Sequence, residues 1–429
     1  MPEPATPHSE RPWEDPGQMI SVDQALERIL AAVSPLPPGM VHLTNALGLV
    51  LASDIIAGAD VPPFRNSAMD GYAVRSGDIT GASVQRPVEL SVAGAIAAGD
   101  PPGMVVDPGQ AIRIMTGAPM PSGADAVVRF EETDEIERSA MVEPPSHAFI
   151  GIQRSPKALD NVRPAGEDIA RGDLALPAGK LLRPKEIGLL AAINVTEVSV
   201  HRRPKVAVLS TGDELADIGE LLQPGQVRNS NSYTLAAMAS QAGAVPYIGG
   251  IARDTVEDLT AKLEQCRSCD FIVTSGGVSL GDYDVVKDIL RAEGAIEIWQ
   301  VRMKPGKPLT FGRIGATPLL GLPGNPVAAA VSFQQFARPA IRRMLGMRDV
   351  SPETVIARLT ERVENRGLRR HFVRAILERN GNEGYTVRSA GGQGAGLLTS
   401  LTRANALLVI PEDVETAEPG MMFQVQILH

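Results

Sequence analysis

The chain has 429 residues, of which 44% are hydrophobic and 21% are charged, and its formal net charge is −9. This balance is typical of a soluble protein of roughly three globular domains, and it excludes both wholesale disorder and a bundle of membrane-spanning helices. The acidic charge also argues against a nucleic-acid partner, so any anionic ligand needs a local basic cluster. The first residues are acidic and proline-rich, unlike a signal peptide, and we expect a cytoplasmic protein.

The first half of the chain is predicted to contain two helices and many short strands. Ser21 and Gln24 have the spacing of a capping box, so the first helix should begin at Ser21. Between residues 41 and 143, short β-like runs alternate with turns, which indicates a small β-rich domain. The second helix is expected over 184–192, opened by a proline at its first turn. The strands expected in this half are 48–56, 71–74, 88–95 and 125–130.

The pattern of predicted elements changes between residues 205 and 346, where strands and helices alternate. The alternating runs are 206–210, 233–241, 245–251, 256–263, 271–274, 285–290, 296–301, 319–322 and 326–345. Alternation at this spacing predicts a doubly wound α/β domain, a parallel sheet with helices on both faces. Ligands of such domains bind at the carboxyl ends of the strands. After residue 350 the pattern returns to strands, at 355–359, 371–377, 385–389 and 406–410, which predicts a terminal β domain.

Two polar turns follow predicted strands of the α/β domain. Ser210-Thr-Gly-Asp-Glu-Leu215 follows the first, and Ser275-Gly-Gly-Val-Ser279 follows the third. Backbone N–H groups exposed at such turns favour a phosphate or another oxyanion. The nearby acids could bind a hard cation such as Mg²⁺ that bridges phosphate oxygens, or could simply cap helices. These acids are Glu214, Asp254, Asp282 and Asp284.

Two further segments could contact an anion. Arg302-Met-Lys304-Pro-Gly-Lys307 places three cations in six residues, and its prolines and glycine stiffen the loop. A multiply charged anion would bind there, although an exposed basic loop is the alternative interpretation. Gly321-Leu-Pro-Gly-Asn-Pro326 joins a buried strand to a helix that begins near Pro326, and it could be an oxyanion site or only a tight turn.

Cysteine and histidine contribute little to the predicted chemistry. Cys266 and Cys269 are the only cysteines, and they could be a redox pair or two small residues near a helix end. Two thiols alone do not complete a structural zinc site. The six histidines are scattered, and the chain has no HExxH, nucleophile-elbow or Walker A motif, which disfavours zincin, serine-hydrolase and P-loop chemistry.

An ordered set of motifs runs along most of the chain and resembles the molybdopterin molybdenumtransferase family, the MoeA type to which the E domain of gephyrin also belongs. The motifs are NSAMDGYAVR at 66–75, RIMTGAPMP at 113–121, STGDEL at 210–215, SGGVSLGDYD at 275–284, KPGKP at 304–308 and GLPGNP at 321–326. No single motif is decisive. Their order and extent make the resemblance specific.

The resemblance implies a homodimer of four-part subunits. Residues 20–60 and 150–204 would form an N-terminal dimerisation domain, and 61–149 a β-rich domain that contributes to the partner's cleft. Residues 205–349 would form the molybdopterin-binding α/β domain, and 350–429 the C-terminal β domain. The implied reaction inserts molybdate into adenylylated molybdopterin with release of AMP, and it depends on Mg²⁺. A molybdopterin adenylyltransferase and the enzymes that receive the cofactor are the implied partners.

Site residues are carried over by motif position. The implied catalytic residues are Asp70, Thr116, Glu214, Asp254, Asp284 and Lys304. The implied cofactor-binding residues are Ser210, Thr211, Gly212, Ser275, Gly276, Gly277, Ser279, Lys304, Lys307, Pro323, Gly324, Asn325, Pro326 and Arg374. Asp254 and Asp284 are the implied Mg²⁺ ligands, while Lys304, Lys307 and the GLPGNP amides would bind molybdate or phosphate.

Three positions depart from the family pattern. Asn229 stands where many relatives have aspartate, Gln300 where some bacterial members have lysine, and Ala395 where serine is frequent. Two rival functions stay open beside the transferase. One is a pterin or nucleotide adenylyltransferase or pyrophosphatase, and the other is a gephyrin-like scaffold with reduced catalysis.

Overall fold

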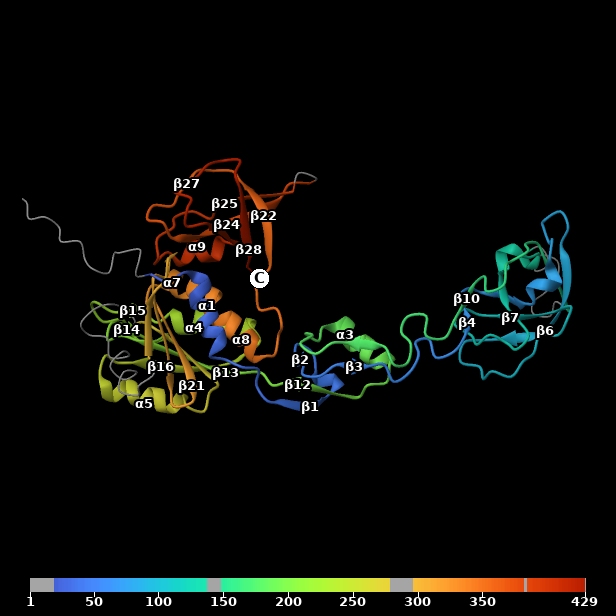
Figure 1. The fold of residues 1–429 in the computed structure, drawn as a ribbon, viewed down its shortest axis with the longest axis horizontal. Helices are drawn as coiled ribbons and strands as arrows, with labels where there is room; N and C mark the ends of the chain where they lie inside the picture. The colour runs from blue at the N-terminus through green and yellow to red at the C-terminus, as the bar shows by residue number, and fades with distance from the viewer. Residues whose placement is uncertain (1–18, 137–147, 278–295, 382–383, 429) are drawn as a thin grey trace, which may run out of the picture.

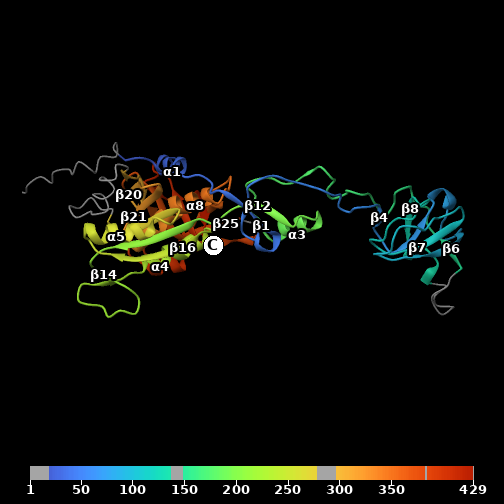
Figure 2. The same ribbon diagram turned by 90° about the horizontal axis from the view of Figure 1, so that it is seen from below.

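The computed structural model describes residues 19–136, 148–277, 296–381 and 384–428. These residues form an elongated molecule (Figures 1 and 2). A two-layer assembly of the α/β unit and the C-terminal unit lies at one end, a small middle unit follows, and a β-rich distal unit lies at the other end. Among the described residues, no helix is long and apolar enough to cross a membrane.

Helix α1 (Val22–Ala31) begins where the capping box predicted. The Gln24 amide N–H donates to Ser21 Oγ at 3.0 Å, and the Ser21 N–H donates to Gln24 Oε1 at 2.9 Å. The buried face of α1 contributes Val22, Ala25 and Ile29 to the core of the α/β unit. Residues 20–60 were predicted to belong to an N-terminal dimerisation domain, and within that range the apolar stripe of α1 packs against the α/β unit.

The middle unit is assembled from two separate segments of the chain. Its main sheet has the antiparallel order β1 (Pro38–His42), β12 (Glu197–His201), β2 (Val50–Leu51). Strand β3 (Ile55–Ile56) pairs with β11 (Leu174–Leu176), and helix α3 (Pro184–Ala192) spans the range predicted for the second helix. One shared core joins the two segments, in agreement with a domain split by an insertion.

The inserted distal unit is β-rich, as predicted. Its five-stranded sheet has the order β8 (Ala126–Arg129), β5 (Gly71–Val74), β7 (Gln110–Ile114), β6 (Val88–Ile96), β9 (Phe149–Ile152), with apolar clusters on both faces. The short pair β4 (Asn66–Ser67) and β10 (Val162–Arg163) lies where the chain enters and leaves this unit. Among the described residues of the first half of the chain, short 3₁₀ turns occur at η3 (Leu43–Asn45), η4 (Ser76–Ile79) and η5 (Phe130–Glu132).

The α/β unit contains a six-stranded sheet. Its order is β16 (Val245–Ala252), β13 (Lys205–Thr211), β17 (Phe271–Ser275), β21 (Thr317–Leu322), β20 (Pro308–Ile314), β18 (Ile296–Gln300). The first four strands are parallel, as predicted, but β20 runs antiparallel to both neighbours. The prediction of an entirely parallel sheet was therefore wrong, because β20 and β21 form an antiparallel hairpin through a turn at Gly315.

Helices cover both faces of this sheet, which confirms the doubly wound arrangement. Helices α4 (Asn231–Gln241), α7 (Pro326–Ser332) and α8 (Arg338–Met344) share one core with alternate residues of β13 and β17. Helix α5 (Val256–Cys266) packs on the other face. The single helix expected over 326–345 is divided by a π-helical segment, η6 (Phe333–Ala337). The expected helix at 285–290 lies outside the described residues.

The C-terminal unit is a closed five-stranded barrel. Strands β24 (Arg370–Arg379), β25 (Tyr385–Ser389), β22 (Thr354–Leu359), β28 (Met422–Ile427) and β26 (Ala406–Ile410) follow one another around it, and β26 pairs back to β24. Apolar side chains fill the interior. The remaining short elements are β14 (Leu215–Ala216), β15 (Val227–Arg228), β19 (Met303–Lys304), β23 (Val363–Glu364), β27 (Thr416–Ala417) and helix α9 (Leu398–Arg403).

Candidate functional site

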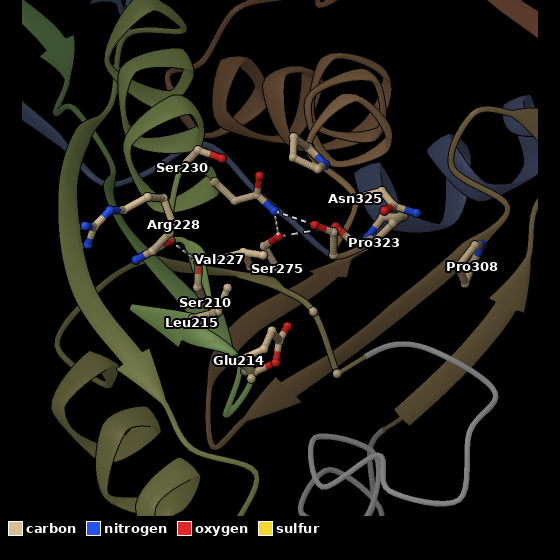
Figure 3. Close-up of a pocket in the computed structure, with 18 of the residues that line it drawn as sticks. Ser210, Glu214, Leu215, Val227, Arg228, Ser230, Ser275, Pro308, Pro323 and Asn325 are labelled. Atoms are coloured by element: carbon tan, nitrogen blue, oxygen red, sulfur yellow. Dashed lines mark hydrogen bonds between the residues drawn. The ribbon is translucent and has the colours of Figure 1, made fainter. Parts of the chain in front are cut away.

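A cleft of about 1060 Å³ opens at the carboxyl ends of the parallel strands, where ligands of doubly wound domains bind (Figure 3). Strands β13, β17 and β21 and the first turns of α4 and α7 supply most of its wall. The structure brings together thirteen of the predicted residues there: Ser210, Thr211, Gly212, Glu214, Asp254, Ser275, Gly276, Gly277, Lys307, Pro323, Gly324, Asn325 and Pro326.

Glycines allow the strand-end turns to approach one another closely. Gly276 has a φ of +95°, and a Cβ at this position would lie 2.6 Å from the Thr211 carbonyl oxygen. A Cβ on Gly324 would lie 3.6 Å from the Gly276 Cα, so three strand ends meet at one place. A larger side chain at Gly276 would push the turns apart, which explains why the motif needs glycine here.

Carboxylates lie on one wall of the cleft. Glu214 follows β13 and Asp254 follows β16, and a Cβ on Gly212 would clash with the Glu214 carboxylate. The Arg253 guanidinium braces this turn by donating to the carbonyl oxygens of Asp213 and Leu215, both at 3.2 Å. No three His, Cys, Asp or Glu residues of the described ranges form a metal-binding cluster. The predicted Ser279, Asp282 and Asp284 lie outside those ranges.

A buried polar network forms the floor of the cleft and includes one of the three departures. The Ser210 hydroxyl donates to Asn229 Oδ1 at 3.0 Å and lies 2.8 Å from Ser232 Oγ. The Ser232 N–H donates to the same Asn229 oxygen at 3.2 Å, which fixes the orientation of the amide. Among the other departures, Gln300 lines the cleft, and the Ala395 carbonyl accepts from the Val327 N–H of α7.

Lys304 does not line the cleft. It lies near two other cationic side chains, Arg369 and Arg374. Strand β19 pairs with β24 of the barrel and places Lys304 opposite His371. Burial, and then the charges of Arg369 and Arg374, lower the pKa of Lys304. The His371 ring is 2% exposed, its two nitrogens have no partner in the described structure, and burial and the same cations lower its pKa to about 4. The lysine loop, residues 304–307, therefore joins the cleft, at Lys307, to a cationic cluster formed by Lys304, Arg369 and Arg374.

Arg374 is positioned behind the cleft wall. It is fully buried, and its Nε donates to Ser400 Oγ at 3.1 Å. Its Nη2 donates to the carbonyl oxygens of Gly392 and Gly394, both at 3.1 Å. Gln393 completes the contact, since its side chain accepts from the Arg374 N–H and donates to the Arg374 carbonyl. Arg374 thus holds the 391–397 loop, and this loop contacts the start of α7.

Asp70 and Thr116 lie far from the cleft of their own chain. The Thr116 N–H and hydroxyl both donate to Asp70 Oδ1, at 2.6 and 2.8 Å, and these bonds lower the pKa of Asp70. Asp70 lies between β4 and β5 and Thr116 follows β7, all in the distal unit, at the opposite end of the molecule from the α/β unit (Figure 1). A single chain does not bring them to the carboxylates.

The two cysteines do not form a redox site in this structure. Both are free and buried in the core beneath α5. Burial raises the pKa of Cys266 to about 11, which keeps the thiol protonated and unreactive near neutral pH. The interpretation of the pair as two small residues near a helix end is the one that agrees with their burial.

Sequence reasoning missed three residues of this region. Asn231 bridges two cleft turns, His371 faces the cationic cluster, and Gln393 anchors the 391–397 loop. Only Asn231 carried a signal, since it opens a helix next to a polar turn. The other two are isolated polar residues, and only the tertiary structure places them.

Family models cover nearly the whole chain. Residues 20–194 match the MoeA N-terminal region (domains I and II), 207–343 a probable molybdopterin-binding domain, and 356–428 the MoeA C-terminal region (domain IV). Molybdopterin molybdenumtransferase 2 of Mycobacterium tuberculosis is 41% identical over 95% of this chain and 99% of its own length. The molybdopterin molybdenumtransferase of Nostoc sp. is 38% identical over 94% and 93% of the two chains.

A solved structure agrees with this assignment. The molybdopterin biosynthesis MoeA protein of Pyrococcus horikoshii superposes with a TM-score of 0.77 at 32% identity, covering 95% of this chain and 99% of that one. The similarity therefore extends through all four units, in agreement with the order of the sequence motifs. The chain belongs to the MoeA family, the molybdopterin molybdenumtransferases, as those motifs indicated.

Proposed function

We propose that this chain is a molybdopterin molybdenumtransferase that inserts molybdate into adenylylated molybdopterin and releases AMP. One observation carries the proposal: a large cleft is lined by the carboxylates of Glu214 and Asp254 and by Lys307 of the lysine loop. Its volume of about 1060 Å³ exceeds that of most small-molecule pockets and suits a nucleotide joined to a pterin. In the cell we place it in the cytoplasm, supplied by a molybdopterin adenylyltransferase and serving cofactor-dependent enzymes.

The phosphoanhydride of the substrate would lie against the glycine turns. Gly276, Gly277 and Gly324 leave room at the strand ends for a phosphate to approach the backbone, and Lys307 also lines the cleft. When the anhydride bond breaks, negative charge grows on the departing phosphate oxygens. Fixed donors and a nearby ammonium group stabilise that charge without reorganisation.

The carboxylates of the cleft suit Mg²⁺. This ion is commonly held by one or two carboxylates together with water and substrate phosphates, and Glu214 and Asp254 present such oxygens at neighbouring strand ends. We assign the site to Asp254 with Asp284, the latter outside the described residues, and Glu214 lies beside them. When bound, the ion would neutralise charge on the phosphate oxygens.

We assign molybdate to the cationic cluster next to the cleft. Lys304, Arg369 and Arg374 place positive charges near one another and near the buried His371, and no carboxylate contributes to the lowered pKa of Lys304. A dianion would compensate the mutual repulsion of these cations. Lys304 and Lys307 belong to one loop, so the oxyanion and the nucleotide would be held by neighbouring residues.

We further propose a homodimer in which Asp70 and Thr116 reach the cleft of the other chain, with the middle unit forming the dimer interface. Their place in the distal unit supports this arrangement, since a contribution to catalysis then requires a second copy. Mixing inactive Asp70→Ala and Asp254→Ala proteins tests it, because hybrid dimers contain one intact composite site. Recovery of about a quarter of the parent activity is expected for random exchange. No recovery after verified subunit exchange would refute shared sites.

The activity itself is tested with purified adenylylated molybdopterin, molybdate and Mg²⁺. AMP and molybdenum-loaded cofactor should appear in equal amounts, and omission of molybdate should suppress the loaded product. AMP release without loaded cofactor would instead identify a pyrophosphatase. A protein that binds the pterin but yields neither product would indicate a scaffold with lost catalysis.

A further inference from the structure

Asn231, the first residue of α4, connects two of the turns that form the cleft. Its Nδ2 donates one hydrogen bond to Ser275 Oγ at 2.8 Å and another to the Gly324 carbonyl oxygen at 2.7 Å. The Ser275 hydroxyl in turn donates to the Pro323 carbonyl oxygen at 3.2 Å (Figure 3). One amide therefore joins the turn after β17 to the turn after β21.

These contacts fix which way the amide faces. A carbonyl oxygen only accepts hydrogen bonds, so Nδ2 and not Oδ1 must face Gly324. The single proton of the Ser275 hydroxyl is used on Pro323, so this oxygen also accepts from Nδ2. Both amide protons are thus used, and rotation of the amide by 180° would break both bonds. Asn231 lines the cleft, and its Oδ1 has no partner among the described residues.

We propose that Asn231 is a specificity-determining residue, whose Oδ1 accepts a hydrogen bond from an amino group or ring N–H of the ligand's heterocycle. The inference rests on the proposed function, because adenylylated molybdopterin carries two amino-substituted heterocycles, adenine and the pterin. An immobile acceptor favours a ligand that donates and opposes one that presents a carbonyl oxygen at the same position, since two acceptors repel and both stay unpaired.

Calorimetric titration with matched ligand pairs tests the proposal. AMP and IMP differ by an amino group against a carbonyl on the purine, and pterin and lumazine differ in the same way on the pteridine. The parent protein should prefer the amino member of one pair by about tenfold, the usual discrimination for one hydrogen bond at a site built for it. The pair that shows the preference identifies which heterocycle Asn231 contacts.

Substitutions separate recognition from a merely structural role. Asn231→Ala should abolish the preference, and so should Asn231→Asp, because a carboxylate oxygen cannot donate to the Gly324 carbonyl and the side chain would lose its fixed orientation. Ser275→Ala is the matched control, since it loosens the same connection but leaves Oδ1 in place. It should weaken both members of a pair equally and preserve their ratio. The ratio is therefore the informative quantity, because loss of the connection alone would lower all affinities together.

Two outcomes would overturn the inference. One is a parent protein with no preference within either pair, and the other is an Asn231→Ala protein that is folded and keeps the parent's ratio. Neither outcome bears on molybdenum insertion, which is measured separately with the complete substrate. A parent that releases AMP and loads the cofactor but shows no preference would refute the role of Asn231 alone.

Discussion

Protonation of His371 should destabilise the folded protein, because this imidazole is buried among cations. Burial and the charges of Lys304, Arg374 and Arg369 lower its pKa from 6.5 to about 4. In the unfolded chain the ring takes up its proton near pH 6.5. The folded state therefore has its full stability above pH 6.5 and loses stability as the pH falls towards 4.

The size of the effect follows from these two pKa values. Their separation corresponds to about 3.4 kcal/mol once both states have titrated, and to about 2 kcal/mol of unfolding free energy between roughly pH 7.5 and pH 5. His371→Gln keeps a polar side chain of similar size but cannot titrate. Its free energy of unfolding should fall by about 2 kcal/mol less than that of the parent over this interval.

Urea denaturation at the two pH values measures the difference. The control is His42→Gln, which replaces an exposed histidine of β1 that contacts Thr44, so its change in pH dependence shows what the loss of a histidine outside the cationic cluster does. Equal losses of stability in the parent and in His371→Gln would refute the reasoning, since a histidine that stays neutral when buried must contribute to this slope. Because Lys304 adjoins His371, the same titrations repeated with molybdate also report whether the dianion offsets the repulsion.

Three further predictions concern the surroundings of the site. A Cβ on Gly306 would clash with Ser332 Oγ, so Gly306→Ala should displace the lysine loop and weaken molybdate binding, measured by calorimetry, by about tenfold. The control is Gly315→Ala, which is also at positive φ but lies in open space. Its affinity for molybdate should stay near that of the parent. Alkylation of Cys266 at mildly alkaline pH should be slow in the folded protein and fast in urea; rapid labelling without denaturant would contradict its raised pKa. Arg374→Lys should lower the free energy of unfolding by about 2–3 kcal/mol through loss of the bonds to the 391–397 loop, measured by urea titration, and an unchanged midpoint would show that the loop does not depend on them.

Local signals predicted the elements whose boundaries depend on their own residues. The capping box at Ser21 and the proline at the first turn of α3 each act within one helical turn, so α1 and α3 begin where expected. Strand β20 was missed because it directly continues the basic loop from Pro308, and its antiparallel pairing comes from a hairpin that alternation does not encode. The π-helical η6 likewise has no sequence signature and interrupts an otherwise continuous helical pattern.

Some parts of the candidate site could be predicted from local sequence, and others depend on the tertiary structure. Turns after buried strands were predictable, because parallel strands bring their carboxyl ends to one edge and the cleft forms there. Motif spacing did not reveal that Lys304 and Lys307 face different surroundings, since β19 pairs with the barrel while β20 pairs within the α/β sheet. Arg374 was predicted to bind the ligand, and the tertiary structure adds that it holds the 391–397 loop through the carbonyl oxygens of Gly392 and Gly394.

The seam between the α/β unit and the barrel is built to hold cations in place. Strand β19 joins the barrel directly, and Gln335 and Gln426 exchange two buried hydrogen bonds, at 2.8 and 3.1 Å, across the same seam. Electrostatic stabilisation of a developing charge is effective only when the charged groups do not move to meet it. The distal unit, in contrast, is joined through the two-residue strands β4 and β10. In the proposed homodimer, fixed cations at the seam and a separate distal unit carrying Asp70 are therefore compatible, because the distal unit is the part that would reach the second chain.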